Sequence, residues 1–356
     1  MPLNVGLIGL GEVAQLMHLP LLSDDPRWKI TAVCDLSPSL AEAMGARYGA
    51  ALRTSDPAAL IANPGVDVVF ILSPDETHGP FIAAALDAGK HVFVEKPATL
   101  TAETLRPLLE RKTDRVVFVG YMRRYTRPFL AMKAALPEPA AIRHVRIRDL
   151  ITESPFFTAQ TRGPVRAGDV GPEAAAELHR TGEAEVASVI GAAAPAGEKR
   201  AYRTLTGLGC HSLSAMRDLF GMPRRVVSAA QSSGGLVVSA LFDYGSFLAS
   251  YEAAVTEVPV FDAGIDVIGQ HQRLSLSYDT PYVRYLPTTL TTTSLEGGAG
   301  RTVIDGPHFA DPFRIELDAL HAAITEGAPV RTTLADAMED LELIAQIAKG
   351  FAATRG

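Results

Sequence analysis

Cysteine is scarce in this sequence, which has only Cys34 and Cys210 among its 356 residues. Two cysteines give neither a disulfide framework nor a thiol cluster for zinc, and the histidines are scattered, so we expect a reducing, cytoplasmic compartment and no metal. Long apolar runs are also missing, because stretches such as 66–72 have the length of a strand and not of a membrane span. The first residues show no export signal, and we therefore expect no membrane partner.

Long runs of lysine or arginine are absent as well, and the net charge is −7. A nucleic-acid surface needs a basic patch, so we expect no nucleic-acid partner. The remaining composition, 47% hydrophobic and 21% charged residues, is ordinary for a globular protein. The length is sufficient for two domains that each have their own core.

The most informative pattern lies at the start of the chain. An apolar run over 4–8 ends in Gly9-x-Gly11-x-x-Ala14, and Asp35 follows at the end of the next apolar run. Gly9 permits a tight turn, Gly11 lets the backbone approach phosphates, and Ala14 allows close packing of helix on strand. The helix N-terminus then offers unpaired N–H groups to a pyrophosphate. We predict a dinucleotide site that includes Gly9, Gly11, Glu12, Val13, Ala14 and Asp35.

The acid at position 35 also indicates which dinucleotide is bound. A carboxylate at the end of the second strand accepts hydrogen bonds from the ribose hydroxyls and repels a 2′-phosphate. The residues that follow, Leu36-Ser37-Pro38, supply no arginine for such a phosphate. We therefore predict NAD(H) as the cofactor.

Residues 1–120 alternate strand-like and helix-like segments, which predicts a doubly wound parallel sheet. The chain then changes character, with an alternating run over 142–151, an excursion over 158–200 that includes a helix over 172–190, and a helix over 204–220. Strand-like segments with hairpin turns fill 225–293 and predict an antiparallel sheet. Two amphipathic helices close the chain, at 313–325 and 334–353, the second with Thr333 as N-cap.

We accordingly expect two domains. An N-terminal Rossmann domain comprises residues 1–122, and a C-terminal α+β domain with a large, open, mostly antiparallel sheet comprises residues 123–356. The closing helices over 313–353 are placed to pack back on the first domain. A large open sheet face of apolar character would need a cover, so we expect a homo-oligomer.

A second motif, Glu95-Lys96-Pro97, follows an apolar strand directly. Ligands bind at the carboxyl ends of parallel strands in open α/β sheets, so Lys96 is placed to meet a substrate hydroxyl. Most Lys-Pro pairs are surface features, and that alternative applies here too. Proline at this point fixes the backbone and allows a cis bond.

With the glycine turn, this motif and Gly120-Tyr121-Met122-Arg123-Arg124-Tyr125, the whole chain resembles the glucose–fructose oxidoreductase / inositol dehydrogenase / rhizopine catabolism family. The resemblance implies that Lys96 contacts both nicotinamide and the reacting hydroxyl. It places Pro97, Glu95 and the segment from Ser73 and Pro74 to His78 beside the cofactor, although Asp75 stands where asparagine is usual. His78 has the alternative of a helix N-terminal packing residue. Near the substrate the resemblance places Arg123, Arg124 and Tyr125.

The segment 206–214 resembles the family's Asp-x-Gly-x-His-x-x-Asp motif, and it implies that His211 is the general acid/base. Gly207 and Ser214 stand where the family has aspartates. A neutral histidine with a pKa near ~6.5 can accept an alcohol proton without them. A carboxylate or phenol from elsewhere is the other possibility, and the candidates are Tyr202, Asp149 and Asp169.

The resemblance implies an NAD-dependent oxidoreductase that moves hydride between nicotinamide and a secondary alcohol or ketone of a sugar, cyclitol or sugar derivative. Two alternatives stay open. One is an enzyme that retains its NAD and oxidises its substrate transiently, as in glycoside cleavage or epimerisation. The other is a non-catalytic dinucleotide-binding regulator on the same fold. The family resemblance further implies a homodimer or homotetramer.

Overall fold

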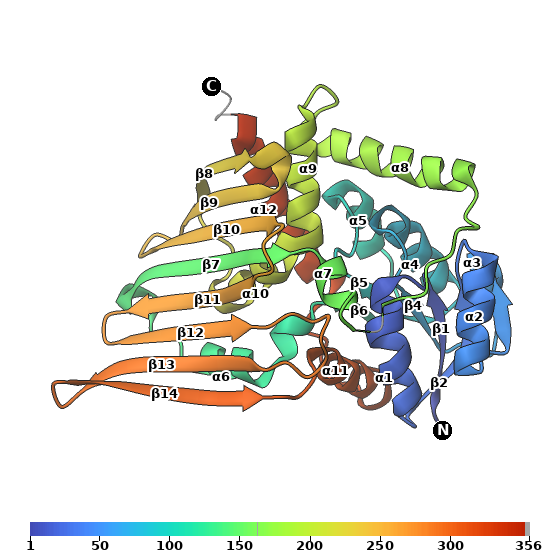
Figure 1. The fold of residues 1–356 in the computed structure, drawn as a ribbon, viewed down its shortest axis with the longest axis horizontal. Coiled ribbons are helices and arrows are strands. Elements are labelled where there is room, and N and C mark those ends of the chain that lie inside the picture. The colour runs from blue at the N-terminus through green and yellow to red at the C-terminus, as the bar shows by residue number, and fades with distance from the viewer. Residues whose placement is uncertain (162, 353–356) are drawn as a thin grey trace. The chain divides into compact units, whose positions relative to one another are not determined.

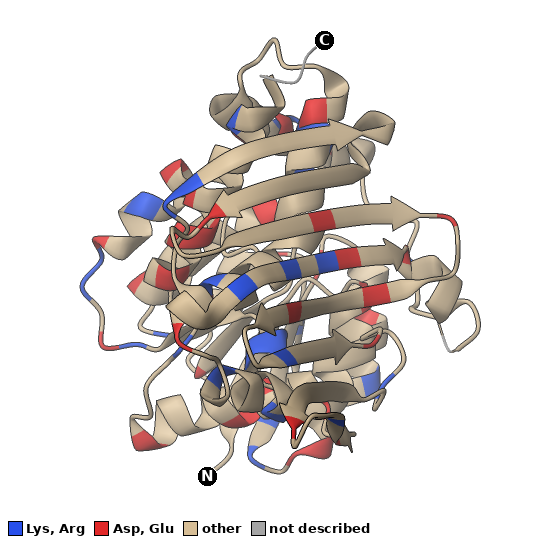
Figure 2. Cartoon of the chain, turned by 90° about the vertical axis from the view of Figure 1, so that its left-hand side faces the viewer, with Lys and Arg blue, Asp and Glu red and all other residues tan. Residues whose placement is uncertain are grey.

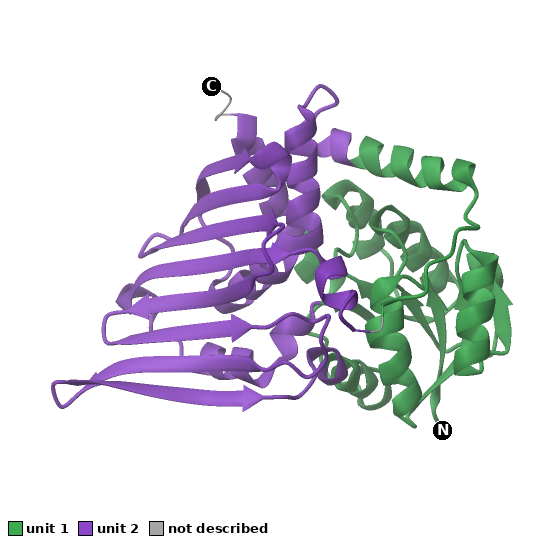
Figure 3. Ribbon diagram, in the orientation of Figure 1, with its two compact units in different colours: residues 1–120, 162–185, 316–338 green, residues 121–161, 186–315, 339–356 purple. Residues whose placement is uncertain are grey.

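The structure is a computed structural model that describes residues 1–161 and 163–352. Its chain forms two compact units (Figure 3). Unit 1 comprises residues 1–120, 162–185 and 316–338, and unit 2 comprises residues 121–161, 186–315 and 339–356. The chain therefore returns twice to unit 1 after leaving it at residue 120. The predicted end of the last helix, residue 353, lies outside the described residues.

Unit 1 is built on a six-stranded parallel sheet (Figure 1). The strand order is β3-β2-β1-β4-β5-β6, which is that of the dinucleotide-binding fold. The predicted Rossmann-like sheet is thus confirmed, with the short β3 as an addition. The strands are β1 Leu3–Ile8, β2 Trp28–Cys34, β3 Leu52–Thr54, β4 Val68–Ile71, β5 His91–Glu95 and β6 Val117–Gly120.

Local sequence explains the elements of unit 1. All four residues of β4 are buried, as expected for a central strand that is covered on both faces. The helix Pro38–Tyr48 (α2) begins where the Ser37 hydroxyl accepts from the Leu40 amide at 3.0 Å, and it ends at Gly49 with φ +72°. The other helices that lie in unit 1 throughout are α1 Leu19–Asp24, α3 Pro57–Ile61, α4 His78–Asp87 and α5 Ala102–Leu109.

Unit 2 holds an eight-stranded sheet in the order β14-β13-β12-β11-β7-β10-β9-β8. Only β7 and β10 pair in parallel, and every other neighbouring pair is antiparallel. The predicted large, mostly antiparallel sheet is confirmed. The strands are β7 Ile142–Thr152, β8 Arg225–Ser232, β9 Val237–Asp243, β10 Leu248–Thr256, β11 Phe261–Gly269, β12 Gln272–Tyr278, β13 Thr288–Glu296 and β14 Ala299–His308.

The hairpin of β13 and β14 was not predicted. Threonine and serine fill β13 and most of β14 is exposed, so neither strand carries the apolar alternation that marks a half-buried strand. The helix expected to begin at residue 204 also differs. It begins as α9 Ala196–Thr204, widens into a π-turn over Leu205–Gly209, and continues as α10 Cys210–Phe220. The glycines of the π-turn and the polar α9 weaken the apolar pattern there.

Three further helices begin in one unit and end in the other. Two short helices belong to unit 2. The crossing helices are α8 Pro172–Ile190, α11 Pro312–Glu326 and α12 Leu334–Phe351. The short helices are α6 Arg127–Ala134 and α7 Ser154–Thr158. The predicted N-cap of α12 is confirmed, because the Thr333 hydroxyl accepts from the Asp336 amide at 3.1 Å. No helix within the described residues is long and apolar enough to cross a bilayer.

One face of the eight-stranded sheet carries charge where we expected apolar residues. Arg146 pairs with Glu252 at 2.7 Å, and Arg148 pairs with Asp262 at 2.6 Å and with Asp266 at 2.5 Å. Figure 2 shows the resulting blue and red bands next to one another on neighbouring strands. The cause is the alternation along β7, where the buried Val145, Ile147 and Asp149 alternate with Arg146 and Arg148 on the opposite face.

Candidate functional site

The glycine turn in unit 1 has the geometry that a dinucleotide requires. Gly9 has φ +90°, and a Cβ at this position would lie 2.5 Å from the Ser73 amide nitrogen. Only glycine fits there. At Gly11 a Cβ would meet nothing within 4 Å, so the backbone borders open space. The helix that follows packs tightly through Ala14, which is buried. The turn therefore leaves room for a phosphate at the helix N-terminus.

Asp35 stands at the carboxyl end of β2, and two backbone amides orient its carboxylate. Oδ2 accepts from the Leu10 amide at 2.8 Å, and Oδ1 accepts from the Ser37 amide at 2.9 Å. Both bonds leave the remaining lone pairs of the carboxylate available. The group is thus fixed beside the glycine turn, where a ribose would meet it.

A cleft of about 290 Å³ joins the glycine turn to Asp35. Ligand pockets typically span about 300–1,000 Å³, so this volume suits part of a dinucleotide. One wall comes from the Rossmann elements and includes Gly11, Glu12, Gln15, Asp35, Ser37 and Leu40. The other wall comes from the returning chain and consists of Pro164, Val165, Arg166, Ala167 and Val170. The predicted site residue Val13 precedes the π-turn Ala14–His18 in the same helix and does not line this cleft.

His78 joins the ends of two neighbouring strands. Its Nδ1 lies 2.8 Å from the Pro97 carbonyl oxygen, and its Nε2 lies 2.8 Å from the Ser73 carbonyl oxygen. The ring is 1% exposed and stands at the first position of α4. The Lys96–Pro97 bond is cis, as the sequence allowed, and Pro74 opens the short turn before α4. His78 therefore holds the backbone around Lys96, which is itself half-buried.

A buried hydrogen bond between His18 and Glu95, the residue before Lys96, was not predicted. His18 Nε2 lies 2.8 Å from Glu95 Oε1, and the Lys96 amide donates to Glu95 Oε2 at 3.2 Å. Burial raises the pKa of the Glu95 carboxyl, but the bond and charge of His18 and the charge of Lys96 outweigh it, so the pKa is below its usual range. The Glu95 side chain is thus buried, and its carboxylate holds the backbone amide of Lys96.

In unit 2 the two arginines of the Met-Arg-Arg-Tyr segment are buried and paired. Arg123 Nη1 lies 2.7 Å from Asp149 Oδ1 and donates to the Ser212 hydroxyl at 2.8 Å. Ser212 and Tyr251 also donate to Asp149, at 2.9 and 3.4 Å. Arg124 Nε donates to Asp218 Oδ2 at 3.3 Å. Both guanidinium groups are therefore engaged within the protein.

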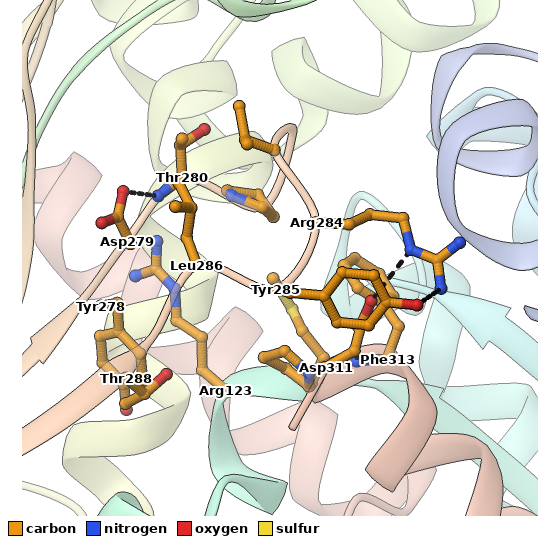
Figure 4. A pocket seen from close by; sticks show the side chains of 14 residues that line it. Arg123, Tyr278, Asp279, Thr280, Arg284, Tyr285, Leu286, Thr288, Asp311 and Phe313 are labelled. Atoms are coloured by element: carbon orange, nitrogen blue, oxygen red, sulfur yellow. Dashed lines mark hydrogen bonds and ion pairs between the residues drawn. The ribbon is translucent and has the colours of Figure 1, made fainter. Parts of the chain in front are cut away.

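A small cavity lies beside Arg123 (Figure 4). Its volume is about 30 Å³, which holds one or two waters and not a sugar. The Arg123 guanidinium lies over the Tyr278 ring at 5.0 Å, and the buried Tyr278 hydroxyl has no hydrogen-bond partner among the described residues. Tyr125, the third residue predicted near the substrate, is buried as well. This cavity is consequently a candidate for ordered water.

His211 stands in the first turn of α10, directly before Ser212. The network of Arg123, Asp149, Ser212 and Tyr251 therefore fixes the backbone that carries the imidazole. Gly207 is exposed, and a Cβ there would meet nothing within 4 Å, so a side chain would fit. Of the candidate replacements for the missing aspartate, Asp149 belongs to this network, Tyr202 is buried in α9, and Asp169 binds elsewhere, at the start of α2.

Within the part of the chain that the structure describes, no three side chains of His, Cys, Asp or Glu are grouped to hold a metal ion. The glycine turn, the open space at Gly11 and the oriented Asp35 do fit a dinucleotide. Residues 3–121 match the family described as the oxidoreductase family with an NAD-binding Rossmann fold, GFO_IDH_MocA. Over these residues the chain is similar to the Gfo/Idh/MocA oxidoreductase family.

Curated relatives carry dehydrogenase names. An inositol 2-dehydrogenase from Rhizobium meliloti (strain 1021) is 34% identical over 140 residues, which is 39% of this chain and 42% of that protein. A D-glucoside 3-dehydrogenase from Escherichia coli (strain K12) is 35% identical over 126 residues, or 35% of this chain and 36% of that protein. The matches thus span about two fifths of the relatives' length.

Solved structures resemble nearly the full length of the chain in their fold. A 3-ketoreductase from Actinomadura kijaniata in complex with NADP and TDP-benzene superposes with a TM-score of 0.73 at 19% identity. The match covers 99% of this chain and 98% of that one. At this identity the likeness concerns the fold, which is thereby the Rossmann unit followed by the large sheet.

Proposed function

We propose that this chain belongs to the Gfo/Idh/MocA family and is an NAD-dependent oxidoreductase acting on a secondary alcohol or ketone of a sugar, cyclitol or sugar derivative. The observation that carries the proposal is the arrangement in unit 1. The glycine turn and Asp35 form a dinucleotide cradle, and Lys96 follows β5 at the same carboxyl edge of the sheet. The dehydrogenase names of the relatives support sugars and cyclitols as the substrate class.

The chemistry that NAD⁺ would supply when bound is acceptance of a hydride from the alcohol carbon, which would leave the hydroxyl proton for the protein to take. Asp35 holds the ribose hydroxyls and disfavours a 2′-phosphate, which makes NAD(H) the expected cofactor. His211 takes the hydroxyl proton as general base, and Lys96 donates a hydrogen bond to the same oxygen. These roles follow the family resemblance at these two positions.

The proposal is tested by following NADH formation with NAD⁺ and a panel of inositols, aldoses and glycosides. Loss of a general acid/base lowers turnover by about 10²–10⁴-fold. We therefore expect Lys96→Met and His211→Asn to lose turnover and to keep NAD binding. Matched controls are Lys112→Met and His179→Asn, since both of these residues are exposed. Turnover that survives in His211→Asn would contradict the assignment, and retained NADH without net turnover would favour transient oxidation.

The charged sheet face of unit 2 bears on assembly, and we propose that the chain forms a homodimer or homotetramer in the cytoplasm. The charged face of the eight-stranded sheet carries internally paired arginines and carboxylates, and such pairs tolerate partial burial. Light scattering of the purified protein at several concentrations measures the mass. A monomer at all concentrations would contradict this assembly.

A further inference from the structure

The segment 163–171, here called the strap, is the second wall of the cofactor cleft. Gln15 ties one end of it, because the Val165 amide donates to Gln15 Oε1 at 2.8 Å and Gln15 Nε2 donates to the Val165 carbonyl at 3.0 Å. Arg166 also lies 3.4 Å from Glu12. The strap belongs to unit 1 and precedes α8 (Figure 3). It thus brings its own side chains to the edge of the dinucleotide cradle.

Asp169 ties the other end of the strap to the N-terminus of α2. Its Oδ1 accepts from the Ser37 hydroxyl, and its Oδ2 accepts from the Ser39 amide at 3.0 Å. These hydrogen bonds hold the pKa of the Asp169 carboxyl below its usual range. The first turn of an 11-residue helix favours a negative charge, so the carboxylate occupies the place that a free anion would take.

Ser37 is therefore engaged by two carboxylates at once. Its amide donates to Asp35 and its hydroxyl donates to Asp169. A 2′-phosphate on a ribose bound at Asp35 would have to take its hydrogen bonds from donors at this same helix start. Asp169 already uses the Ser37 hydroxyl and the Ser39 amide, and it adds a second negative charge. Discrimination by blocked donors and like charge is a common route to specificity.

We infer that Asp169 is a cofactor-specificity residue that excludes NADP(H) by occupying the anion position at the start of α2. The inference rests on the proposed function, since it takes the cleft beside Asp35 as the site of the ribose. It gives the strap a part in cofactor selection that is separate from the part of Asp35. Asp35 selects the ribose hydroxyls, and Asp169 removes the donors that a phosphate would need.

The test measures binding of NADH and NADPH to the purified protein by fluorescence titration, in wild type, Asp169→Ala and Asp169→Asn. We expect Asp169→Ala to bind NADPH roughly tenfold or more tightly than wild type, which is the range of one regained hydrogen bond to a charged group. NADH binding should change by less than about threefold. Asp169→Asn should show a smaller gain, because its amide still competes for the Ser37 and Ser39 donors.

The matched control is Glu173→Gln, which removes an exposed carboxylate just beyond the strap, in the first turn of α8. It should leave both affinities unchanged. NADPH affinity that stays at the wild-type level in both Asp169 variants, with NADH still bound, would overturn the inference alone. Equal losses for both dinucleotides would also overturn it, because Asp169 would then only fasten the strap. Wild type that binds neither dinucleotide would instead contradict the proposed function.

Discussion

Arg123→Met tests the buried ion pair of unit 2 most directly. The substitution keeps an apolar side chain against the Tyr278 ring but removes the guanidinium that lies 2.7 Å from Asp149. Asp149 then keeps only the hydroxyls of Ser212 and Tyr251 as donors. Its side chain is 0% exposed, so no water replaces the lost charge.

Removing one partner of a buried pair typically costs about 3–5 kcal/mol. This is a large share of a folding free energy of about 5–15 kcal/mol. Burial raises the pKa of the Asp149 carboxyl, and Arg123 is the main group that opposes the rise. Without Arg123 the pKa rises further, so the carboxyl can escape the cost by taking up a proton.

The sign of the pH dependence follows from that direction. A carboxyl whose pKa is higher in the folded than in the unfolded state stabilises the fold in its protonated form. This contribution is complete below the unfolded pKa of about 3.9 and is lost as the pH rises through the folded pKa. Arg123→Met should therefore lose most stability near pH ~8 and less near pH ~5.5. The measurement is denaturant unfolding by far-UV circular dichroism at both pH values. The slope of the unfolding free energy against denaturant concentration should be the same in variant and wild type.

Arg146→Met is the matched control, since Arg146 lies on β7, the strand that carries Asp149, but pairs with Glu252 at the exposed face. An exposed pair contributes about 0–1 kcal/mol, so this variant should change little at either pH. The double variant Arg123→Met/Asp149→Leu should recover most of the loss, because apolar replacement of both partners is often neutral. Equal losses in Arg123→Met and Arg146→Met, or a loss independent of pH, would refute the reasoning.

Three further outcomes are expected from the site. Gly9→Ala should abolish dinucleotide binding and destabilise unit 1, because φ is +90° and a Cβ would clash. Gly11→Ala should fold normally and lose only dinucleotide affinity. Dinucleotide titration together with denaturant unfolding distinguishes the two outcomes. Because the pKa of Glu95 is lowered in the folded protein, its ionised carboxylate stabilises the fold above the unfolded pKa of about 4.3, and this stability is lost as the pH falls through the folded pKa. Glu95→Gln should therefore make the free energy of unfolding fall less steeply as the solution is acidified. An unchanged fall on acidification would count against the pair with His18. Gly207→Asp should keep wild-type stability and raise turnover at neutral pH, and an unaltered pH–rate profile would mean that the open position has no catalytic use.

The sequence predicts unit 1 well because its signals are local. The glycine turn, the acid at position 35 and the apolar β4 lie within short stretches, and parallel strands buried on both faces leave continuous apolar runs. The edge hairpin of β13 and β14 escapes prediction for the opposite reason. Exposed threonine-rich strands are stabilised by pairing with a neighbour, and a sequence window does not show the neighbour.

Contacts that depend on the chain's return to unit 1 also lie beyond sequence reasoning. Asp169 is 132 residues from Ser37, and Val165 is 150 residues from Gln15. Neither residue stands in a motif, and the excursion over 158–200 has no strong core pattern apart from α8. His18 and Glu95 are 77 residues apart, so their pairing is equally hard to predict from the sequence. The available signals were a histidine within an apolar helix and an acid at the end of a strand.

The burial of Arg123 and Arg124 argues against the substrate contact that the family resemblance implies for them. A residue that binds substrate needs free donors, yet Arg123 donates to Asp149 and Ser212, and Arg124 donates to Asp218. A sugar hydroxyl would have to compete with a carboxylate for either guanidinium, and a charged acceptor is the stronger partner. Under the proposed function, Arg123 would act on the reaction through its hydrogen bond to Ser212, which follows His211 in the first turn of α10. On this basis Arg123→Met should lower kcat more than it raises KM, while loss of a substrate contact would do the reverse.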